Sequence, residues 1–485
     1  MKHEELLSAL SRMGSNGRAE YEDDKLFQKC FYPVPEQMKA LEPDVVLILG
    51  NRGAGKTSLF RAVAEFGLTE HLRELYPKAR IPDNCTWVPI KLVAKDHVPD
   101  QTQLKAFFER SELTEELAFD FWQCVLVRHV WDQLPSQSQA ACKPIHEASA
   151  SNIDSLLAAA AACRIPSAEA LDRLDDRLEH EKRILFIGFD DLDLLVTKNG
   201  RSATTLISYW ATRSRRWKGI RAKLFMRTDI YRRFGIEGGP DLAKISATRV
   251  SLAWSDESLL AMLVKRIINS GEIAEWKGPL ALSAKELIHD ERFGWSLKKE
   301  TPEKLQDIIS SLIGPYMGAG PKKGATQTWI INHIKDCQDN AVPRFLVRMI
   351  ESAAELQLAS RNEYQVILSP LFIREALTRI SNDHVRDSLT EWPWLSGFQE
   401  RVRRLPKIQT VPFERKVFEN GIEKTWTDSW GTNIEQPCDS PRDFLSLLVE
   451  AGIMRERRDG RFETTDLYLD GLGFKRKGGV RRRSH

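Results

Sequence analysis

Short apolar runs alternate with amphipathic segments over the first half of the chain. Five segments share the pattern of a buried strand: DVVLILG (44–50), CTWVPIKLV (85–93), RILFIGFDDLDLL (183–195), AKLFMRTDI (222–230) and RVSLAW (249–254). Runs without polar interruptions are typical of central strands in a parallel sheet, whose two faces are both covered. Because helical segments separate the runs, the sequence predicts an α/β fold with a doubly wound parallel sheet.

The segments between the second and third strands predict an insertion at about residues 135–180. Before it, residues 113–134 have apolar positions at helical spacing. Within it, SQSQAACKP is loop-like, Ala158–Ala162 falls in a predicted helix, and AEALDRLDDRLEHEKR predicts a charged helix. We therefore expect a helical insertion in the α/β domain.

The pattern changes after Ser255. Residues 255–365 are mainly helical, as in SLLAMLVKRIINS and VPRFLVRMIESAAELQLAS. The last stretch has further helices and then two short strands around Asp459-Gly460, a pair that favours a hairpin turn. Helices followed by such a hairpin suggest a winged-helix module. We predict a P-loop domain at 1–254, a helical lid domain at 255–365 and a winged-helix-like domain with a basic tail at 366–485.

A phosphate-binding loop follows the first strand. The sequence matches G-x-x-x-x-G-K-[ST] at every fixed position. A chance match is expected in roughly one or two of a hundred chains of this length, and the flanking strand and helix make it rarer still. The predicted nucleotide-binding residues are Gly50, Asn51, Arg52, Gly53, Ala54, Gly55, Lys56, Thr57 and Ser58.

The spacing of this motif predicts ATP and Mg²⁺ as ligands. Glycines let consecutive N–H groups turn inward around phosphate oxygens, beside the positive end of the following helix. Lys56 is expected to reach the β- and γ-phosphates, and the Thr57 hydroxyl to ligate Mg²⁺.

Acidic residues end the third predicted strand. Asp190 follows Phe189 directly and is predicted to join the Mg²⁺ shell, because strand ends face the phosphate crevice. Asp191 or Asp193 is predicted to orient or deprotonate the attacking water; the alternative is a helix cap near Leu194. No glutamate directly follows Asp190, whereas vigorous AAA+ ATPases usually have one there. We therefore expect slow hydrolysis.

Two arginines are candidates for sensing the γ-phosphate. Arg227 ends the fourth predicted strand, and its alternative role is a surface ion pair. Arg344 lies at a helix start in the lid, where an ordinary exposed helix arginine is nearly as good an interpretation. Lys244, Arg232 or Arg233 could act on the nucleotide of a neighbouring subunit, but none of the three is favoured.

Composition points to a protein of the reducing cytoplasm. No apolar run approaches the roughly 20 residues that span a membrane, and the beginning of the chain lacks the apolar core of a secretory signal. The seven cysteines are scattered, without a C-x-x-C pair. A net charge of +3 does not by itself imply nucleic acid, but the tail GFKRKGGVRRRSH has six cations and no acid. The alternative is that such basic runs form a solvated surface.

With these motifs placed, the chain resembles prokaryotic P-loop ATPases close to the STAND and AAA+ groups. The resembling segments are LILGNRGAGKTSLFRA, LFIGFDDLD, LFMRTDIYRRF, DLAKISATRVSLAW, AVPRFLVRM and the end, from LLVEAGI to FKRKGG. FDDLD also resembles the acidic box of KAP-type NTPases, whereas no glycine-x-proline box of the NB-ARC type is visible. The resemblance implies an ATP-controlled conformational switch, often found in bacterial antiviral defence or mobile-element systems.

Three functions remain open at this stage. The first is a STAND-like ATPase switch that hides or exposes a surface for an unknown protein partner or effector, with nucleotide-dependent homo-oligomers. The second is a DNA-acting ATPase of initiator or loader type that uses the winged helix and basic tail. The third, a small-molecule kinase, is weak because no lid arginine cluster is apparent.

Overall fold

The computed structural model describes residues 3–14, 19–92, 98–195, 200–234, 243, 245–360 and 364–477. The chain forms two compact units: residues 33–253, and residues 1–32 together with 254–485. Each unit is described by itself below.

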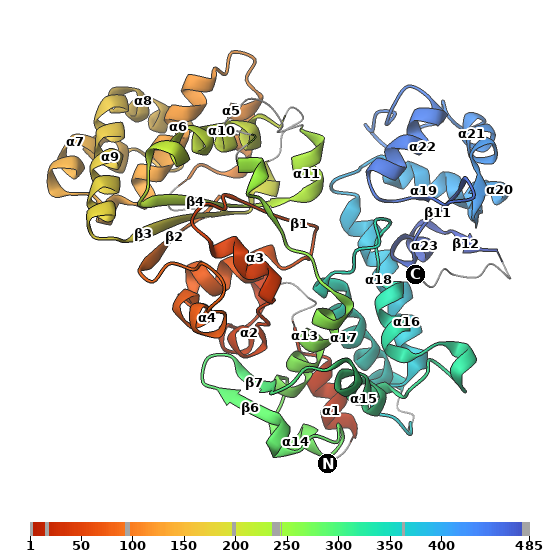
Figure 1. Cartoon of the computed structure of the whole chain (residues 1–485). Helices are drawn as coiled ribbons and strands as arrows, with labels where there is room; N and C mark the ends of the chain where they lie inside the picture. The colour runs from red at the N-terminus through yellow and green to blue at the C-terminus, as the bar shows by residue number, and fades with distance from the viewer. Residues whose placement is uncertain are drawn as a thin grey trace. The chain divides into compact units, whose positions relative to one another are not determined.

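A five-stranded sheet is the centre of unit 33–253 (Figure 1). Its strands are β1 (Leu47–Gly50), β2 (Cys85–Lys91), β3 (Ile184–Asp190), β4 (Ile220–Arg227) and β5 (Val250–Ser251). The order is β2-β3-β4-β1-β5, and every neighbouring pair is parallel. All five predicted strands and the parallel α/β fold are confirmed. One strand, β4, separates the P-loop strand β1 from the acid-bearing strand β3.

Helices cover both faces of this sheet. On one face lie α5 (Gln101–Glu109), α6 (Glu115–His129), α7 (Ser136–Glu147), α8 (Ile153–Ala162), α9 (Arg164–His180) and α10 (Arg201–Arg216) (Figure 1). On the other lie α3 (Lys56–Phe60), the π-helical turn η4 (Arg61–Glu65) and α4 (Thr69–Leu75). The 3-10 turns η3 (Pro35–Leu41), η5 (Trp131–Gln133) and η6 (Leu192–Leu195) and helix α11 (Thr228–Arg233) complete the unit. Strand residues Leu47, Ile48 and Leu49 are buried because both faces are covered.

Two charged residues are buried in this core and bind backbone groups. The carboxylate of Asp175 on α9 accepts hydrogen bonds from the N–H groups of Lys218, Gly219 and Ile220 at 2.8–3.0 Å. The ammonium of Lys223 on β4 donates to the carbonyls of Ala40 (2.9 Å) and Val45 (2.6 Å), and also to that of Glu42. Buried polar groups need such partners. Together these contacts hold the segments that lead into β4 and β1.

The prediction of a loop at SQSQAACKP is wrong, because this segment lies in helix α7, which includes Pro144. Cys142 and Ile145 are fully buried on one side of α7, which packs against α6 and α9. Burial of these side chains outweighs the local loop preference of serine and proline. The predicted helices at 113–134, 158–162 and 168–183 are confirmed, with α9 beginning four residues earlier than expected.

The other unit is mainly helical. Its N-terminal elements are α1 (His3–Leu10), η2 (Ala19–Tyr21) and α2 (Asp24–Cys30). Next come α13 (Asp256–Asn269), α14 (Ile273–Lys277), η7 (Ala284–Glu286), α15 (Pro302–Ile313), η8 (Pro321–Lys323), α16 (Thr326–His333), α17 (Pro343–Ser360) and α18 (Pro370–Ser388). The helical character predicted for 255–365 is thus confirmed.

A hairpin interrupts these helices and was not predicted. It consists of β6 (Leu287–Asp290) and β7 (Gly294–Leu297), which pair antiparallel. Two side chains of α13 hold it: Lys265 donates to the Phe293 carbonyl at 2.6 Å, and the Asn269 amide bonds both backbone groups of Trp295. Because these partners lie more than twenty residues away in the sequence, the local pattern does not reveal the hairpin.

The end of this unit combines short helices with a small antiparallel sheet. The helices are α19 (Leu395–Arg404), α20 (Pro406–Gln409), α21 (Arg415–Glu423), α22 (Pro441–Glu450) and α23 (Asp466–Leu472). Strands β9 (Phe413–Glu414), β10 (Arg455–Glu456) and β11 (Arg461–Glu463) form a sheet in the order β10-β11-β9, and β8 (Thr410–Val411) pairs with β12 (Lys475–Arg476). The predicted hairpin turn at Asp459-Gly460 is confirmed, with Gly460 in the left-handed region at φ 75°.

Residues before Tyr32 pack with the helical unit, which differs from the expected boundary at 254. Helix α1 packs against α17, and α2 against α13. Buried Glu22 accepts a hydrogen bond from Arg266 at 2.7 Å, and the Gly14 N–H donates to Glu351 at 2.7 Å. The polypeptide therefore passes between the units twice, at residues 32–33 and 253–254. The separation of a lid at 255–365 from a domain at 366–485 stays a prediction.

Candidate functional site

The backbone between β1 and α3 curls as a phosphate-binding loop requires. Gly53 and Gly55 have φ values of 82° and 98°, in the left-handed region that favours glycine. Gly50 is needed for a different reason: a Cβ there would lie 3.2 Å from the Ala54 Cβ and 3.3 Å from the Lys56 Cγ. These glycines permit the tight curl in which successive N–H groups form an anion-binding concavity.

Lys56 is buried inside this curl, with only 8% of the residue exposed. Its Nζ donates to the carbonyl of Gly50 at 3.2 Å and lies 3.5 Å from that of Asn51. Burial lowers the pKa of Lys56, while the nearby Asp193 and Asp190 act in the opposite direction. An anionic oxygen bound in the loop would give this ammonium a charge-assisted hydrogen bond, which is stronger than its bonds to neutral carbonyls.

Thr57 and Asp190 form the second part of the site. The Thr57 hydroxyl is hydrogen-bonded to the carboxyl group of Asp190, which ends β3 and is 4% exposed. Burial, followed by the charge of Asp191, raises the pKa of Asp190 to about 7. A nearby cation would stabilise the ionised form of this carboxyl group.

The donor chemistry of this pair fits Mg²⁺, which prefers hard oxygen ligands and keeps several waters. Within the described residues, no group of three His, Cys, Asp or Glu side chains is placed to hold a metal. Mg²⁺ at this place would therefore be held by Thr57 and Asp190, with phosphate oxygens and water as its other ligands.

Asp191 and Asp193 follow the end of β3 but differ in backbone geometry. Asp191 has φ 62°, which is uncommon for a residue other than glycine. Asp193 lies within the 3-10 turn η6, and its charge acts on Lys56. The described helical turn near Leu194 is η6, which begins at Leu192, two residues before the expected start. Asp193 is thus no cap of that turn.

Arg227 is placed directly beside the loop. It ends β4 and is the register partner of Gly50 on β1. Its guanidinium forms a two-pronged ion pair with Asp229, at 3.0 Å from Nε and 2.7 Å from Nη2. Its side chain is 13% exposed, and its charge acts on Lys56. Arg227 therefore lies beside the loop, as a role in sensing the nucleotide requires, and it also forms the ion pair that the alternative interpretation predicted.

Asp229 was missed as a site residue. The signal was present in the spacing Arg227-Thr228-Asp229, because an acid two residues after an arginine is near enough in the chain to pair with it; Asp229 lies in the first turn of α11. Burial opposes the ionisation of Asp229, but Arg227 outweighs it and holds the pKa of this carboxyl below its usual value.

Arg344 is the second residue of α17, at the helix start that the sequence predicted. It belongs to the helical unit, so its role as a nucleotide sensor stays a prediction. Arg232 and Arg233 lie in α11, and Lys244 is outside the described residues.

The cysteines and the lengths of the helices are two further properties of the chain. All seven cysteines are free thiols, as their spacing predicted. Over the described part of the chain, each helix is too short or too polar to cross a bilayer.

No protein-family model matches this chain. No curated protein matches it either. Among solved structures it is similar to the Walker-type ATPase of Pyrococcus abyssi, with 13% identity and a TM-score of 0.43 over 91% of this chain and 96% of that one. It is also similar to the ORC2 protein of Aeropyrum pernix in ADPNP–ADP complexes, with 14% identity and a TM-score of 0.41 over 90% of this chain and 88% of that one. Because both TM-scores are below 0.5, no residue role is taken from either protein. The parallel sheet with a glycine-rich loop after β1 makes this chain an α/β protein with a P-loop core.

Proposed function

We propose that the chain is an ATPase that binds ATP with Mg²⁺ in the loop Gly50–Ser58 and acts as a nucleotide-dependent switch. One observation carries the proposal: Lys56, Thr57, Asp190 and Arg227 meet at the carboxyl edge of a single parallel sheet. This edge is where α/β folds bind ligands. A lysine, a hydroxyl–carboxylate pair and an arginine are the groups that phosphoryl transfer requires.

In the proposed mechanism each side chain has a distinct task. Lys56 exchanges the Gly50 carbonyl for β- and γ-phosphate oxygens. Thr57 and Asp190 hold Mg²⁺, which when bound supplies positive charge to those oxygens. Asp191 or Asp193 orients the attacking water or accepts its proton.

We propose that hydrolysis is slow, because aspartate and not glutamate follows Asp190. The aspartate at position 191 is one methylene shorter than glutamate, so its carboxyl group has less reach toward a water in line with the γ-phosphate. Slow turnover suits a protein that persists in one nucleotide state.

The switch itself would operate between the two compact units. Two polypeptide crossings join them, and Arg227 belongs to one unit whereas Arg344 belongs to the other. We propose that both arginines sense the γ-phosphate, so that ATP and ADP favour different arrangements. The resemblance to STAND-type ATPases adds a protein partner or effector, nucleotide-dependent homo-oligomers and a defence or mobile-element setting to this proposal.

Hydrogen exchange with no nucleotide, with ADP and with a non-hydrolysable ATP analogue tests the switch. We expect both nucleotides to protect residues 50–58, and only the ATP analogue to change exchange at 250–258 and at the start of α17. Identical exchange in ADP and analogue outside the loop would contradict a switch while leaving nucleotide binding intact.

A second candidate function is a DNA-acting ATPase of initiator or loader type. The observation that favours it is the element order α19, α20, β8, β9, α21, α22, β10, β11 with sheet order β10-β11-β9, which we interpret as a winged helix. Lys475 and Arg476 of β12 begin the basic tail beside this sheet. DNA titrations at several salt concentrations, with the full chain and with a chain ending at residue 474, test it. Each lost phosphate contact should lower the log–log salt slope by about 0.9; binding that is absent or independent of salt would reject this function.

A further inference from the structure

A cavity of about 210 Å³ lies in the helical unit, between α16, the loop that follows it and the sheet of the winged-helix-like end. It is far from the P-loop motif in sequence and belongs to the other unit. Four of its lining residues are cations, namely Lys335, Arg455, Arg457 and Arg476, and three are acids, namely Asp339, Glu463 and Asp466. Since one water occupies roughly 30 Å³ of liquid, the cavity has room for about seven waters, or for a small organic anion.

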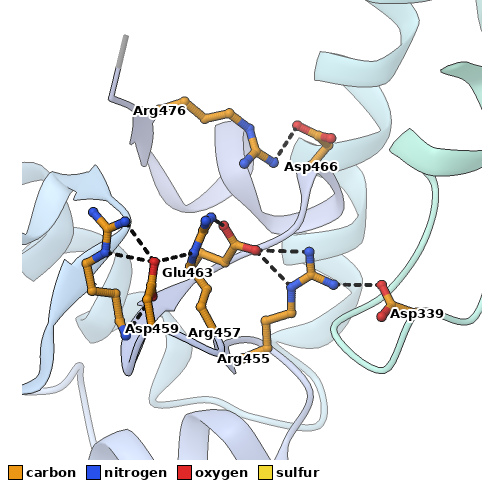
Figure 2. A network of polar contacts seen from close by, with 8 residues as sticks. Asp339, Arg455, Arg457, Asp459, Glu463, Asp466 and Arg476 are labelled. Carbon is orange, nitrogen blue, oxygen red and sulfur yellow. Dashed lines mark hydrogen bonds and ion pairs between the residues drawn. The ribbon is translucent and has the colours of Figure 1, made fainter. Parts of the chain in front are cut away.

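The cations and acids form an ordered network (Figure 2). Arg455 lies between two acids, at 2.9 Å from Glu463 and 2.7 Å from Asp339. Arg457 donates to the other oxygen of Glu463 at 2.7 Å, and Arg476 donates to Asp466 at 3.1 Å. Arg476 Nε is buried without a hydrogen-bond acceptor, whereas Arg457 Nε forms an ion pair with Asp459 at 3.4 Å.

The acids of this network are not equivalent. The side chain of Glu463 is 9% exposed and that of Asp466 is 8% exposed, so both are fixed in the protein. The side chain of Asp339 is 46% exposed and comes from the loop between α16 and α17, not from the sheet. An exposed ion pair contributes little to stability, because water and salt screen it. Asp339 is therefore the acid that another anion displaces most easily.

The loop that carries Asp339 is already ordered. The Asp336 carboxylate accepts hydrogen bonds from the Gln338 N–H at 2.8 Å and the Asn340 N–H at 2.9 Å, and the Asp336 N–H donates to the Asn340 carbonyl at 2.9 Å. A rotation of the Asp339 side chain into solvent would break its ion pair with Arg455, together with the other contacts of Asp339. The loop backbone can stay in place.

This rotation changes the charge of the cavity lining. With Asp339 in place, the lining has four cations and three acids, a net charge of +1; without it, four cations face two acids, a net charge of +2. A phosphomonoester has a charge of about −1.5 to −2 at neutral pH, and arginine forks match its oxygens in pairs. Part of the cavity wall is apolar and consists of Ala325, Trp329, Val411 and Pro412. Such a wall suits the carbon part of an ester.

We propose that this cavity binds a small phosphomonoester, whose phosphate pairs with Arg455 in place of Asp339. Arg476 and Lys335, which now pair with Asp466 and Asp256, are the further cations of the lining that the phosphate would draw on. The proposal does not depend on the proposed ATPase function, because it uses residues of the other unit only.

The test uses the full-length chain with Lys56→Ala, so that phosphate binding by the P-loop is weakened and the Arg455 and Asp339 variants report on the cavity. Titration calorimetry with inorganic phosphate and with glycerol 3-phosphate is expected to show saturable binding, tighter for the ester. Arg455→Gln should weaken it at least about tenfold, because a charge-assisted pair is lost. Asp339→Asn should tighten it by about fivefold, because the internal competitor is removed.

Arg458→Gln is the matched control, since Arg458 is an exposed arginine of the same hairpin that does not line the cavity. Equal effects of Arg455→Gln and Arg458→Gln, or an affinity that Asp339→Asn does not change, would overturn the proposal. If Arg455→Gln does not fold, as judged by circular dichroism, Lys335→Gln replaces it with the same expected loss. Absence of binding in both the parent and Asp339→Asn proteins also overturns it.

An oligonucleotide with and without a 5′-phosphate separates small esters from nucleic acid. We expect only the phosphorylated form to compete with glycerol 3-phosphate. Equal competition by both forms would assign the cavity to a nucleic-acid backbone and contradict the small-ester assignment.

Discussion

At the scale of single residues, burial decides which charged groups define the P-loop site. Lys56 and Asp190 are 8% and 4% exposed, and each bonds a neighbour in the site, the Gly50 carbonyl and the Thr57 hydroxyl. Neither group is in its most favourable electrostatic surroundings without a ligand, since burial opposes the charged form of both. An anion beside Lys56 and a cation beside Asp190 would each stabilise the charged form of the neighbouring side chain.

The metal role of Asp190 leads to a first prediction. Asp190→Asn keeps the shape of the side chain but removes its negative charge, so Mg²⁺-dependent ATP hydrolysis should fall at least about 100-fold. Nucleotide affinity measured with a chelator in place of Mg²⁺ should stay within a few fold. Asp176→Asn is the control, because Asp176 is exposed on α9. Unchanged hydrolysis in Asp190→Asn would show that this carboxyl group does not hold the metal.

A second residue supports the sheet below the site. Lys223→Met keeps most of the side-chain volume but leaves the carbonyls of Ala40, Glu42 and Val45 without their donor. We expect a loss of about 3 kcal/mol or more in the free energy of unfolding, since each unsatisfied buried group costs about 1–3 kcal/mol. Urea unfolding measures it. Lys218→Met, which removes an exposed pair with Glu179, should cost less than about 1 kcal/mol; similar losses in both variants would contradict the assigned role of Lys223.

At the scale of elements, close packing of helices sets a third expectation. Helix α23 crosses α18 at Gly471, where a Cβ would lie 2.4 Å from the Ser381 carbonyl and 2.6 Å from Val385. Gly471→Ala should therefore destabilise the protein by about 1–3 kcal/mol through overpacking.

Gly278→Ala is the matched control for this substitution. A Cβ at Gly278 meets nothing within 4 Å, and its φ of −65° suits alanine. Its thermal midpoint should stay the same or rise slightly. A Gly471→Ala midpoint equal to that of Gly278→Ala would show that α23 and α18 do not pack as described.

Sequence patterns predicted elements well where the signal was local. The five strands have apolar runs that both faces of the sheet bury, and the Asp459-Gly460 turn depends on two adjacent residues. Helix α7 and the β6–β7 hairpin were missed for the same physical reason: their partners are distant. Burial of Cys142 and Ile145 under other helices stabilises α7, and Lys265 and Asn269 of α13 hold the hairpin.

At the scale of the whole molecule, the P-loop motif identified the candidate site but not its full set of side chains. Its fixed positions follow from the backbone and phosphate chemistry, so they are readable from one segment. The pairing of Arg227 with Asp229 and the placement of Arg227 beside Gly50 depend on the order of strands, which one segment does not determine. Likewise, the packing of residues before Tyr32 with the helical unit depends on long-range contacts such as Glu22 with Arg266.

The most direct test of nucleotide binding at Gly50–Ser58 is the affinity for Mg²⁺-ATP of the wild-type protein, Lys56→Ala and Lys143→Ala, measured by titration with a fluorescent ATP analogue. Lys143 is an exposed lysine of α7, with 65% of its side chain accessible, so its substitution controls for loss of charge. We predict at least about a tenfold weaker affinity for Lys56→Ala, because charge-assisted bonds to the phosphates are lost, and an unchanged affinity for Lys143→Ala. Equal affinity of Lys56→Ala and wild type, with both folded, would contradict the assignment of this loop as the nucleotide site.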